Sequence, residues 1–141
     1  MELRQKIQII QNLIKVENFT SAIINCKKLL KKYPNNSFVY NLCGLALQGD
    51  RKIVSSVEFF TQALFHEPEN IAAMNNLANS YKHLNQIEKA EDLYLKIIKK
   101  DPENIKALNN YGNLMQKLNN FNEAIKIYEK AFLINKNQLN I

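Results

Sequence analysis

Apolar residues recur along this chain at the spacing of one helix face, in eight separate stretches. In the first stretch Ile7, Ile10 and Ile14 lie three or four positions apart, as on one side of an α-helix. Turn-forming residues separate the stretches, and a proline follows the second, fourth and sixth. The pattern predicts eight helices, over residues 3–15, 19–32, 37–48, 53–65, 71–84, 87–99, 105–118 and 121–134.

The connections between the predicted helices carry capping and turn residues. Asn36, Asn70 and Asn104 each precede a helix, and an asparagine oxygen can accept a hydrogen bond from the free amides of a first turn. Gly49 and Asp50 favour a turn that begins earlier in the second pair of helices than in the other pairs.

The whole pattern repeats at one constant interval, which separates Pro34, Pro68 and Pro102. Some columns of equivalent positions are small throughout, whereas others are large and apolar. Examples are Ala22, Ser56, Ala90 and Ala124 for the first kind and Phe19, Ile53, Ile87 and Phe121 for the second. Four copies without insertion, at 3–36, 37–70, 71–104 and 105–138, therefore form a stacked array within one domain, 1–141.

One copy contains Leu77-Ala78-x-x-Tyr81, then Ala90-x-x-x-Tyr94, then Pro102. These residues resemble the tetratricopeptide repeat (TPR) family, a helix-turn-helix unit with small, aromatic and proline residues at fixed offsets. The resemblance implies an all-α, right-handed superhelical solenoid of four helix-turn-helix (TPR) repeats. It also implies a concave groove lined by the first helix of each copy.

The two ends of the array differ from the inner copies. Ile10 stands where a small residue is usual in this family, and Lys136 replaces the proline. Family arrays usually finish with an extra polar-faced helix, and Ile125 and Phe132 would be partly uncovered without one. We therefore expect either that the chain is the N-terminal part of a longer protein or that this end meets another copy.

Carboxamides gather on the predicted groove side of the first helices. The candidate peptide-binding residues are Asn41, Asn75, Asn76, Asn79, Lys82, Lys106, Asn109, Asn110 and Asn113. An asparagine side chain has both donors and an acceptor, so it can bind both polar groups of a peptide unit. A row of them would hold an extended polypeptide backbone.

This row resembles the asparagine column in the repeat domain of O-linked N-acetylglucosamine transferase, where Asn76 and Asn110 occupy the matching positions. The earlier copies have Gln8 and Leu42 in that column, so the row has two clear members. The alternative is compositional: the chain has 21 asparagines, many of them in turns or caps. A carboxylate clamp on a peptide terminus is disfavoured, since only Lys106 matches a basic clamp position.

The net charge of +6 raises the possibility of nucleic-acid binding. Lys27, Lys28, Lys31 and Lys32 cluster at the end of the second predicted helix. Lysines there also complement the helix dipole, and similar lysines recur in the third copy beside acidic residues. A solvated helix end is the favoured interpretation, and a nucleic-acid partner is not expected.

The remaining chemistry is sparse. Cys26 and Cys43 lie in apolar columns, which favours core packing in a reducing compartment such as the cytoplasm. His66 and His83 stand apart, with no partner spacing for a metal or a nucleophile, so we expect no cofactor and no enzymatic activity. No signal peptide or membrane-length apolar run is visible.

These patterns predict a protein-interaction scaffold that binds a polypeptide segment in an asparagine-rich concave groove. Two alternatives stay open. The chain could be a targeting or oligomerisation module of a larger, transferase-like enzyme, or, with less support, a basic nucleic-acid binder.

Overall fold

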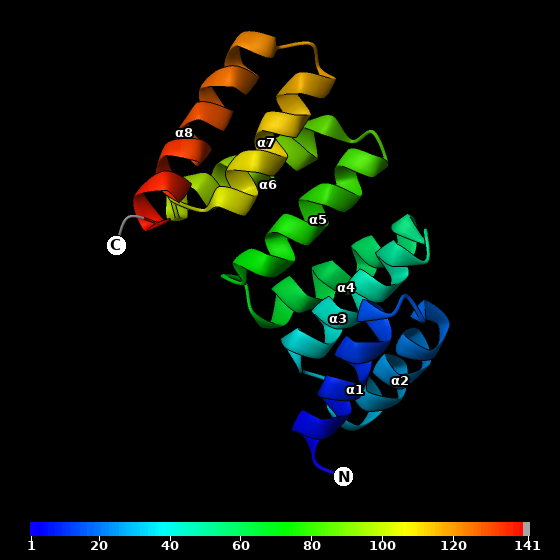
Figure 1. The fold of residues 1–141 in the computed structure, drawn as a ribbon. Helices are drawn as coiled ribbons and strands as arrows, with labels where there is room; N and C mark the ends of the chain where they lie inside the picture. Colours follow the sequence, from blue (N-terminus) through cyan, green and yellow to red (C-terminus); the bar gives the residue numbers. More distant parts are fainter. Residues whose placement is uncertain (140–141) are drawn as a thin grey trace.

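The structure, a computed structural model, describes residues 1–139 and contains only helices in that range (Figure 1). Residues 140 and 141, the last two of the expected domain, lie outside the described range. The helices are α1 (Leu3–Lys15), α2 (Phe19–Lys32), α3 (Ser37–Gly49), α4 (Ile53–His66), α5 (Ile71–His83), α6 (Ile87–Lys100), α7 (Ile105–Lys117) and α8 (Phe121–Leu139). Each copy of the repeat therefore contains one helical hairpin.

The predicted caps are confirmed. The side-chain oxygens of Asn36, Asn70 and Asn104 accept hydrogen bonds from the backbone amides of Val39, Ala73 and Ala107 in the first turns of α3, α5 and α7, at 3.0, 3.0 and 2.9 Å. Asn18 caps α2 in the same way, at 3.3 Å. Each bond satisfies an amide that a helix start would otherwise leave unpaired.

The early turn expected in the second repeat is wrong. All four repeats turn at the same position, where Glu17, Arg51, Asn85 and Asn119 have positive φ angles of 59°, 62°, 58° and 60°. Gly49 is the last residue of α3, and a Cβ there would collide with the ring of Phe19. The glycine therefore makes room for an aromatic ring and does not form the turn.

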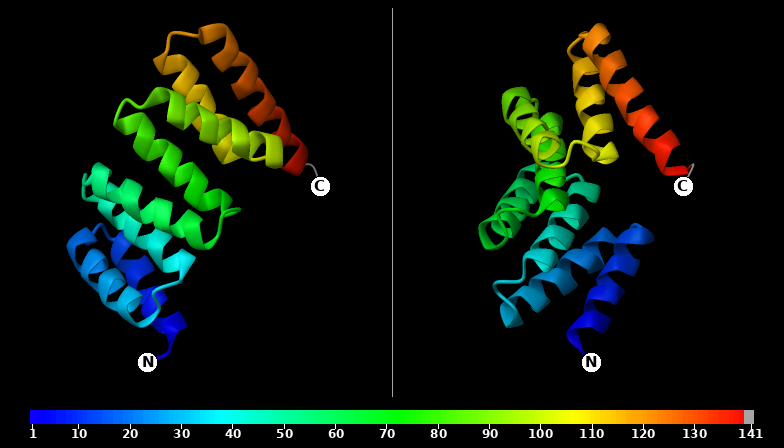
Figure 2. Two further views of the ribbon diagram at one scale, coloured as in Figure 1. Left: turned by 180° about the vertical axis from the view of Figure 1, so that it is seen from behind. Right: turned by 90° about the vertical axis from the view of Figure 1, so that its left-hand side faces the viewer.

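The hairpins stack in a curved row, which the right-hand view of Figure 2 shows from the side. The first helices of adjacent repeats contact one another, α1 with α3, α3 with α5 and α5 with α7. The second helices make no such contact with each other within residues 1–139. The first helices are thus drawn together on the inner side of the curve, while the second helices spread on the outer side.

Small residues allow the two helices of a hairpin to approach closely. Ala22, Ser56, Ala90 and Ala124 are buried, as their column predicts. A Cβ at Gly112 would lie 2.6 Å from the ring of Tyr128 in α8. Gly44 is in the same position against Phe60 of α4, so these glycines of the first helices make room for aromatic rings of the second helices.

Candidate functional site: the amide face

The nine candidate residues, here called the amide face, lie on α3, α5 and α7, on the inner side of the array. They differ in how far their side chains are buried. Asn41, Asn75 and Asn76 are buried, with 7%, 2% and 5% of their surface exposed. Asn79, Lys82 and Asn110 are half-buried, whereas Lys106, Asn109 and Asn113 are exposed.

The deeper asparagines bind one another across adjacent repeats. Asn76 Nδ2 donates to Asn41 Oδ1 at 3.0 Å, and Asn110 Nδ2 donates to Asn75 Oδ1 at 2.9 Å. These bonds join α3 to α5 and α5 to α7. The equivalent residues between α1 and α3 are Ile7 and Leu42, both apolar. At this position, each contact between the first helices of adjacent repeats therefore pairs either two carboxamides or two aliphatic side chains.

Asn41, Asn75 and Asn76 do not line an open groove, contrary to the expectation from the sequence. Buried polar groups need partners, because an unsatisfied one costs about 1–3 kcal/mol. These carboxamides supply partners to each other, and no buried side-chain nitrogen or oxygen in residues 1–139 lacks one. The amide pairs hold neighbouring repeats in register.

A second set of asparagines binds tyrosines of the same repeat, in the third and fourth repeats. The hydroxyl of Tyr94 donates to Asn79 Oδ1, and the hydroxyl of Tyr128 donates to Asn113 Oδ1. Burial raises the pKa of Tyr94, so its hydroxyl stays protonated and can donate. The second repeat has Leu45 and Phe60 at these two positions, again a matched apolar pair.

The structure also contains a buried polar cluster that the sequence reasoning missed. Gln48 Nε2 donates to Ser80 Oγ at 3.0 Å, and the hydroxyls of Ser80 and Ser56 lie 2.8 Å apart. Both serines are fully buried and link α3, α4 and α5. The available signal was a serine, Ser56, in a column that is otherwise alanine.

The accessible part of the amide face is positively charged. Together with the neighbouring Gln116 it is here called the open end, on α5 and α7, and its residues are Lys82, Lys106, Asn109, Asn113 and Gln116. Burial, with the nearby charge of Lys117, lowers the pKa of Lys82. At the opposite end of the face Phe38 is 46% exposed. The accessible surface thus passes from apolar on α3 to amide and cationic on α7.

The cysteines are core residues, as predicted. Cys26 and Cys43 are both fully buried in the cluster between the first hairpin and α3. The hydrogen bond between their side chains, together with burial, raises the pKa of the Cys26 thiol. No group of three metal-binding side chains occurs in the described residues. Of the helices described, none combines the length and apolar character that a membrane crossing requires.

Known proteins share both the sequence pattern and the fold. Residues 4–137 match the family model described as Psidin, N-terminal TPR repeats region. The chain is 33% identical over 66 residues to the human protein O-mannosyl-transferase TMTC3, covering 47% of this chain and 7% of that protein. It is 33% identical over 89 residues to ycf37 of Pyropia yezoensis, covering 57% of this chain and 50% of that protein. The chain thus spans at most about half the length of these relatives.

The backbone is similar to that of MamA from Desulfovibrio magneticus RS-1, in a structure beginning at its residue 41. The TM-score is 0.85 at 20% identity, and the match covers 97% of this chain and 77% of that one. This likeness shows the fold. Because the family match extends through all four hairpins, and because the caps and small columns recur at the family's interval, the chain belongs to the tetratricopeptide repeat family.

Proposed function

We propose that this chain is a protein-interaction scaffold that binds a polypeptide segment along the open end of the amide face. The TPR fold supports protein-interaction scaffolding in general, and it is typically non-catalytic. The observation that carries the finer proposal is the exposed, cationic and carboxamide-rich surface on α5 and α7, which has no acidic residue at its groove positions.

The chemistry of the open end favours an extended segment with acidic side chains. Asn109 is exposed and has no hydrogen-bond partner among residues 1–139, so its donors and its acceptor can serve a peptide unit. Lys106, one turn before it on α7, and Lys82, on α5, supply positive charge to the open end. Towards α3, Phe38 offers an apolar contact to the same segment.

The test uses random peptides displayed on phage and selected against the whole chain, followed by calorimetry on the best binder. Changing Lys106→Glu with Asn109→Ala should weaken binding roughly tenfold, the scale of two charge-assisted or neutral hydrogen bonds. The matched control, Lys96→Glu with Asn122→Ala on the second helices, should leave affinity unchanged. If the open-end variant and the control variant bind the selected peptide with equal affinity, the open end is not the binding surface.

Substitution of Asn76 or Asn110 does not test this proposal. Each donates to a carboxamide of the preceding repeat, so removing it disturbs the packing of neighbouring hairpins. A loss of binding in such a variant would combine a folding effect with a binding effect. The exposed residues of the open end avoid that difficulty.

A second candidate function is self-association through α8. Its residues Phe121, Ile125, Phe132 and Leu139 are 55%, 54%, 66% and 79% exposed. With Tyr128 and Asn135 between them, they follow the alternating spacing of four and three positions that forms the seam of paired helices. We propose that the covering element is α8 of a second copy of this chain.

The polarity of the N-terminal end favours pairing of α8 with α8 over head-to-tail stacking. Gln5 and Asn12 are exposed on α1. The same columns are buried in the later repeats, as Val39, Ala73 and Ala107, and as Ala46, Ser80 and Leu114. Stacking α1 on α8 would bury the two carboxamides, whereas pairing two α8 helices would bury apolar surface on both sides.

Sedimentation equilibrium tests the pairing. The chain should form a dimer as its concentration rises, and Phe132→Glu should make it monomeric. Phe65→Glu is the matched control, because Phe65 is 75% exposed on α4. A chain that stays monomeric at all concentrations, or a control that dissociates the dimer equally, would overturn the proposal.

A further inference from the structure

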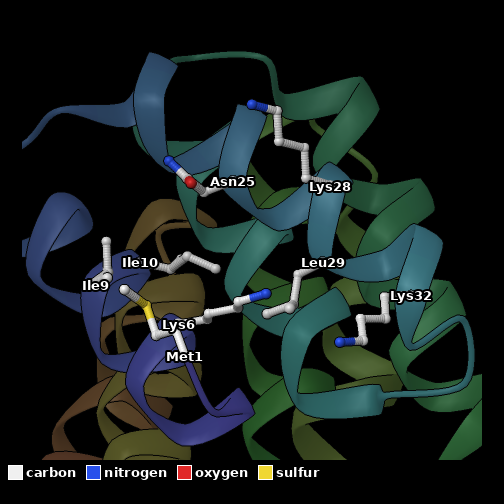
Figure 3. A pocket seen from close by; sticks show the side chains of 8 residues that line it. All are labelled: Met1, Lys6, Ile9, Ile10, Asn25, Lys28, Leu29 and Lys32. Carbon is white, nitrogen blue, oxygen red and sulfur yellow. The ribbon is translucent and has the colours of Figure 1, made fainter.

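A pocket of about 280 Å³ opens between α1 and α2, at the N-terminal end of the array (Figure 3). Its lining residues are Met1, Lys6, Ile9, Ile10, Asn25, Lys28, Leu29 and Lys32. None of them belongs to the amide face. The pocket is therefore a separate site.

Comparison with the second repeat shows how the lining of the pocket differs from the equivalent positions. The positions of Lys6, Asn25 and Lys32 are occupied one repeat later by Tyr40, Phe59 and His66. There the three rings pack together: Tyr40 stacks on His66 with centroids 5.5 Å apart and lies 6.2 Å from Phe59. The aromatic side chains fill part of the equivalent space in the second repeat, and the pocket that remains beside Tyr40 and Phe59 is smaller, about 200 Å³, with Glu58 in its lining.

The third and fourth repeats carry apolar side chains at these positions, although a pocket of about 230 Å³ remains beside Leu108 and Ile127 in the fourth repeat. Lys6 and Asn25 correspond to Met74 and Leu93 in the third repeat, and to Leu108 and Ile127 in the fourth. Met74 and Leu108 are buried. The first repeat alone carries an amine and an amide at these two positions. Its pocket has three lysines and no acidic residue in its lining, whereas the pockets of the second and fourth repeats include Glu58 and Glu123.

The pocket combines an apolar floor with a positively charged rim. Ile10 and Leu29 are buried beneath it, and Ile9 is partly exposed at its side. In Figure 3, the side chain of Lys6 extends from α1 towards Leu29 in the centre of the view, Lys32 lies to the right of Leu29, and Lys28 and Asn25 lie above. No ion pair within residues 1–139 involves these three lysines, since the pairs found are Lys52–Asp50 and Lys100–Glu69.

We propose that this pocket binds an acidic peptide segment that inserts one bulky apolar side chain between α1 and α2. The apolar side chain rests on Ile10 and Leu29. Carboxylates on either side of it pair with Lys6, Lys28 and Lys32. Binding pockets for whole small ligands usually measure roughly 300–1,000 Å³, so a volume just below that range suits a single inserted side chain.

The floor argues against nucleic acid as the occupant. Lysines spread along a surface bind a phosphate backbone, and such a site does not require buried aliphatic side chains beneath the lysines. Here the lysines surround Ile10 and Leu29. The neighbouring Lys27 is directed elsewhere, with its Nζ 5.9 Å from the centre of the Phe59 ring.

Fluorescence anisotropy tests the pocket with a fluorescein-labelled peptide, Glu-Asp-Phe-Asp-Glu, capped at both ends. The whole chain should bind it, and Lys6→Gln with Lys32→Gln should weaken binding roughly tenfold, because two charged contacts are lost. The matched control is Lys96→Gln with Lys130→Gln, which makes the same change in net charge at exposed positions equivalent to Lys28. The control should bind like the unchanged chain.

A graft of the second repeat provides a variant that keeps the fold. Lys6→Tyr with Asn25→Phe and Lys32→His copies the aromatic filling of the next hairpin, so helix content by circular dichroism should be retained while peptide binding is lost. A peptide with Ala in place of Phe should also fail to bind. Absence of binding to the unchanged chain, equal binding of the Ala peptide, or equal weakening by the control would each overturn the proposal. So would tighter, Lys6-dependent binding of a single-stranded oligonucleotide.

Discussion

At the scale of single residues, the asparagines on the inner side are matched to their neighbours. Asn79 accepts from Tyr94 in the third repeat, and the second repeat places Leu45 beside Phe60 at the equivalent positions. The first repeat has Gln11 and Cys26 there. Where a tyrosine is present, in the third and fourth repeats, an asparagine accepts its hydroxyl, which satisfies a group that would be costly to leave unpaired.

The paired columns predict a coupling between Tyr94 and Asn79. Tyr94→Phe removes one hydrogen bond and should lower the free energy of unfolding by about 1 kcal/mol. Adding Asn79→Leu recreates the pair found in the second repeat and should recover most of that loss. Urea unfolding of both single variants and the double variant measures the coupling. Strictly additive losses would show that the two side chains act independently.

Tyrosine burial predicts a loss of stability at alkaline pH. Burial, with a hydrogen bond to Glu91, raises the pKa of Tyr111 to about 12, whereas an unfolded tyrosine titrates near pH 10. Between these values the unfolded chain binds fewer protons, so the stability present below pH 10 falls as pH rises towards 12. Urea midpoints across this window should fall less in Tyr111→Phe, with Tyr33→Phe as the control. An identical slope in all three chains would contradict the assignment.

At the scale of helices, the boundaries follow local chemistry closely. Every first helix has 13 residues, and the αL residue recurs at the same place in each copy, from Glu17 to Asn119. The first helices end at Lys15, Gly49, His83 and Lys117, so a glycine stands at this position in the second copy alone. The helix that it ends nevertheless has the same length as the others. Turn chemistry predicts a break at this glycine, but close contact with Phe19 in α2 of the preceding repeat explains it instead.

This assignment predicts how Gly49 responds to substitution. Gly49→Leu should lower the free energy of unfolding by about 1–3 kcal/mol, since the new side chain overpacks the contact with Phe19. Combining it with Phe19→Ala should restore part of the loss by freeing the space. Thermal and urea unfolding compare the variants. If the second change brings no recovery, the requirement for glycine does not come from Phe19.

At the scale of the whole molecule, contacts are confined to neighbours. Every helix–helix contact in residues 1–139 lies within one repeat or between adjacent repeats. Stability in such an array is approximately a sum of repeat terms and interface terms. Among these residues, the inner helices have partners on both sides, whereas α1 and α8 are each covered on one side only.

The terminal hairpins should therefore open before the inner ones. Hydrogen exchange followed by mass spectrometry is expected to show the fastest exchange among helical amides in α1 and α8, and the slowest in α3 to α5. Asn104→Ala removes the cap of α7, which costs about 1 kcal/mol, and should speed exchange most in the fourth repeat. Uniform exchange across all eight helices would instead indicate a single cooperative unit.

The sequence by itself determined the period, the helices and most of their boundaries. Caps such as Asn70, turns and amphipathic spacing act over short stretches of chain, so their pattern is legible in a single sequence. Because the pattern recurs in every copy, the chain specifies the same boundaries four times. The family resemblance and the burial of Cys26 and Cys43 followed from the same columns.

Only the tertiary structure decided which polar residues remain accessible. Asn75 and Asn109 occupy the same column, yet Asn75 is buried and Asn109 is exposed. The reason is that Asn110 of the following repeat covers Asn75 and donates to it, whereas no following repeat covers Asn109 within the described residues. The pairing of asparagines from adjacent repeats arises from the stacking of hairpins and has no local signature. The pocket beside Lys6 likewise depends on what the packed neighbour positions leave unfilled.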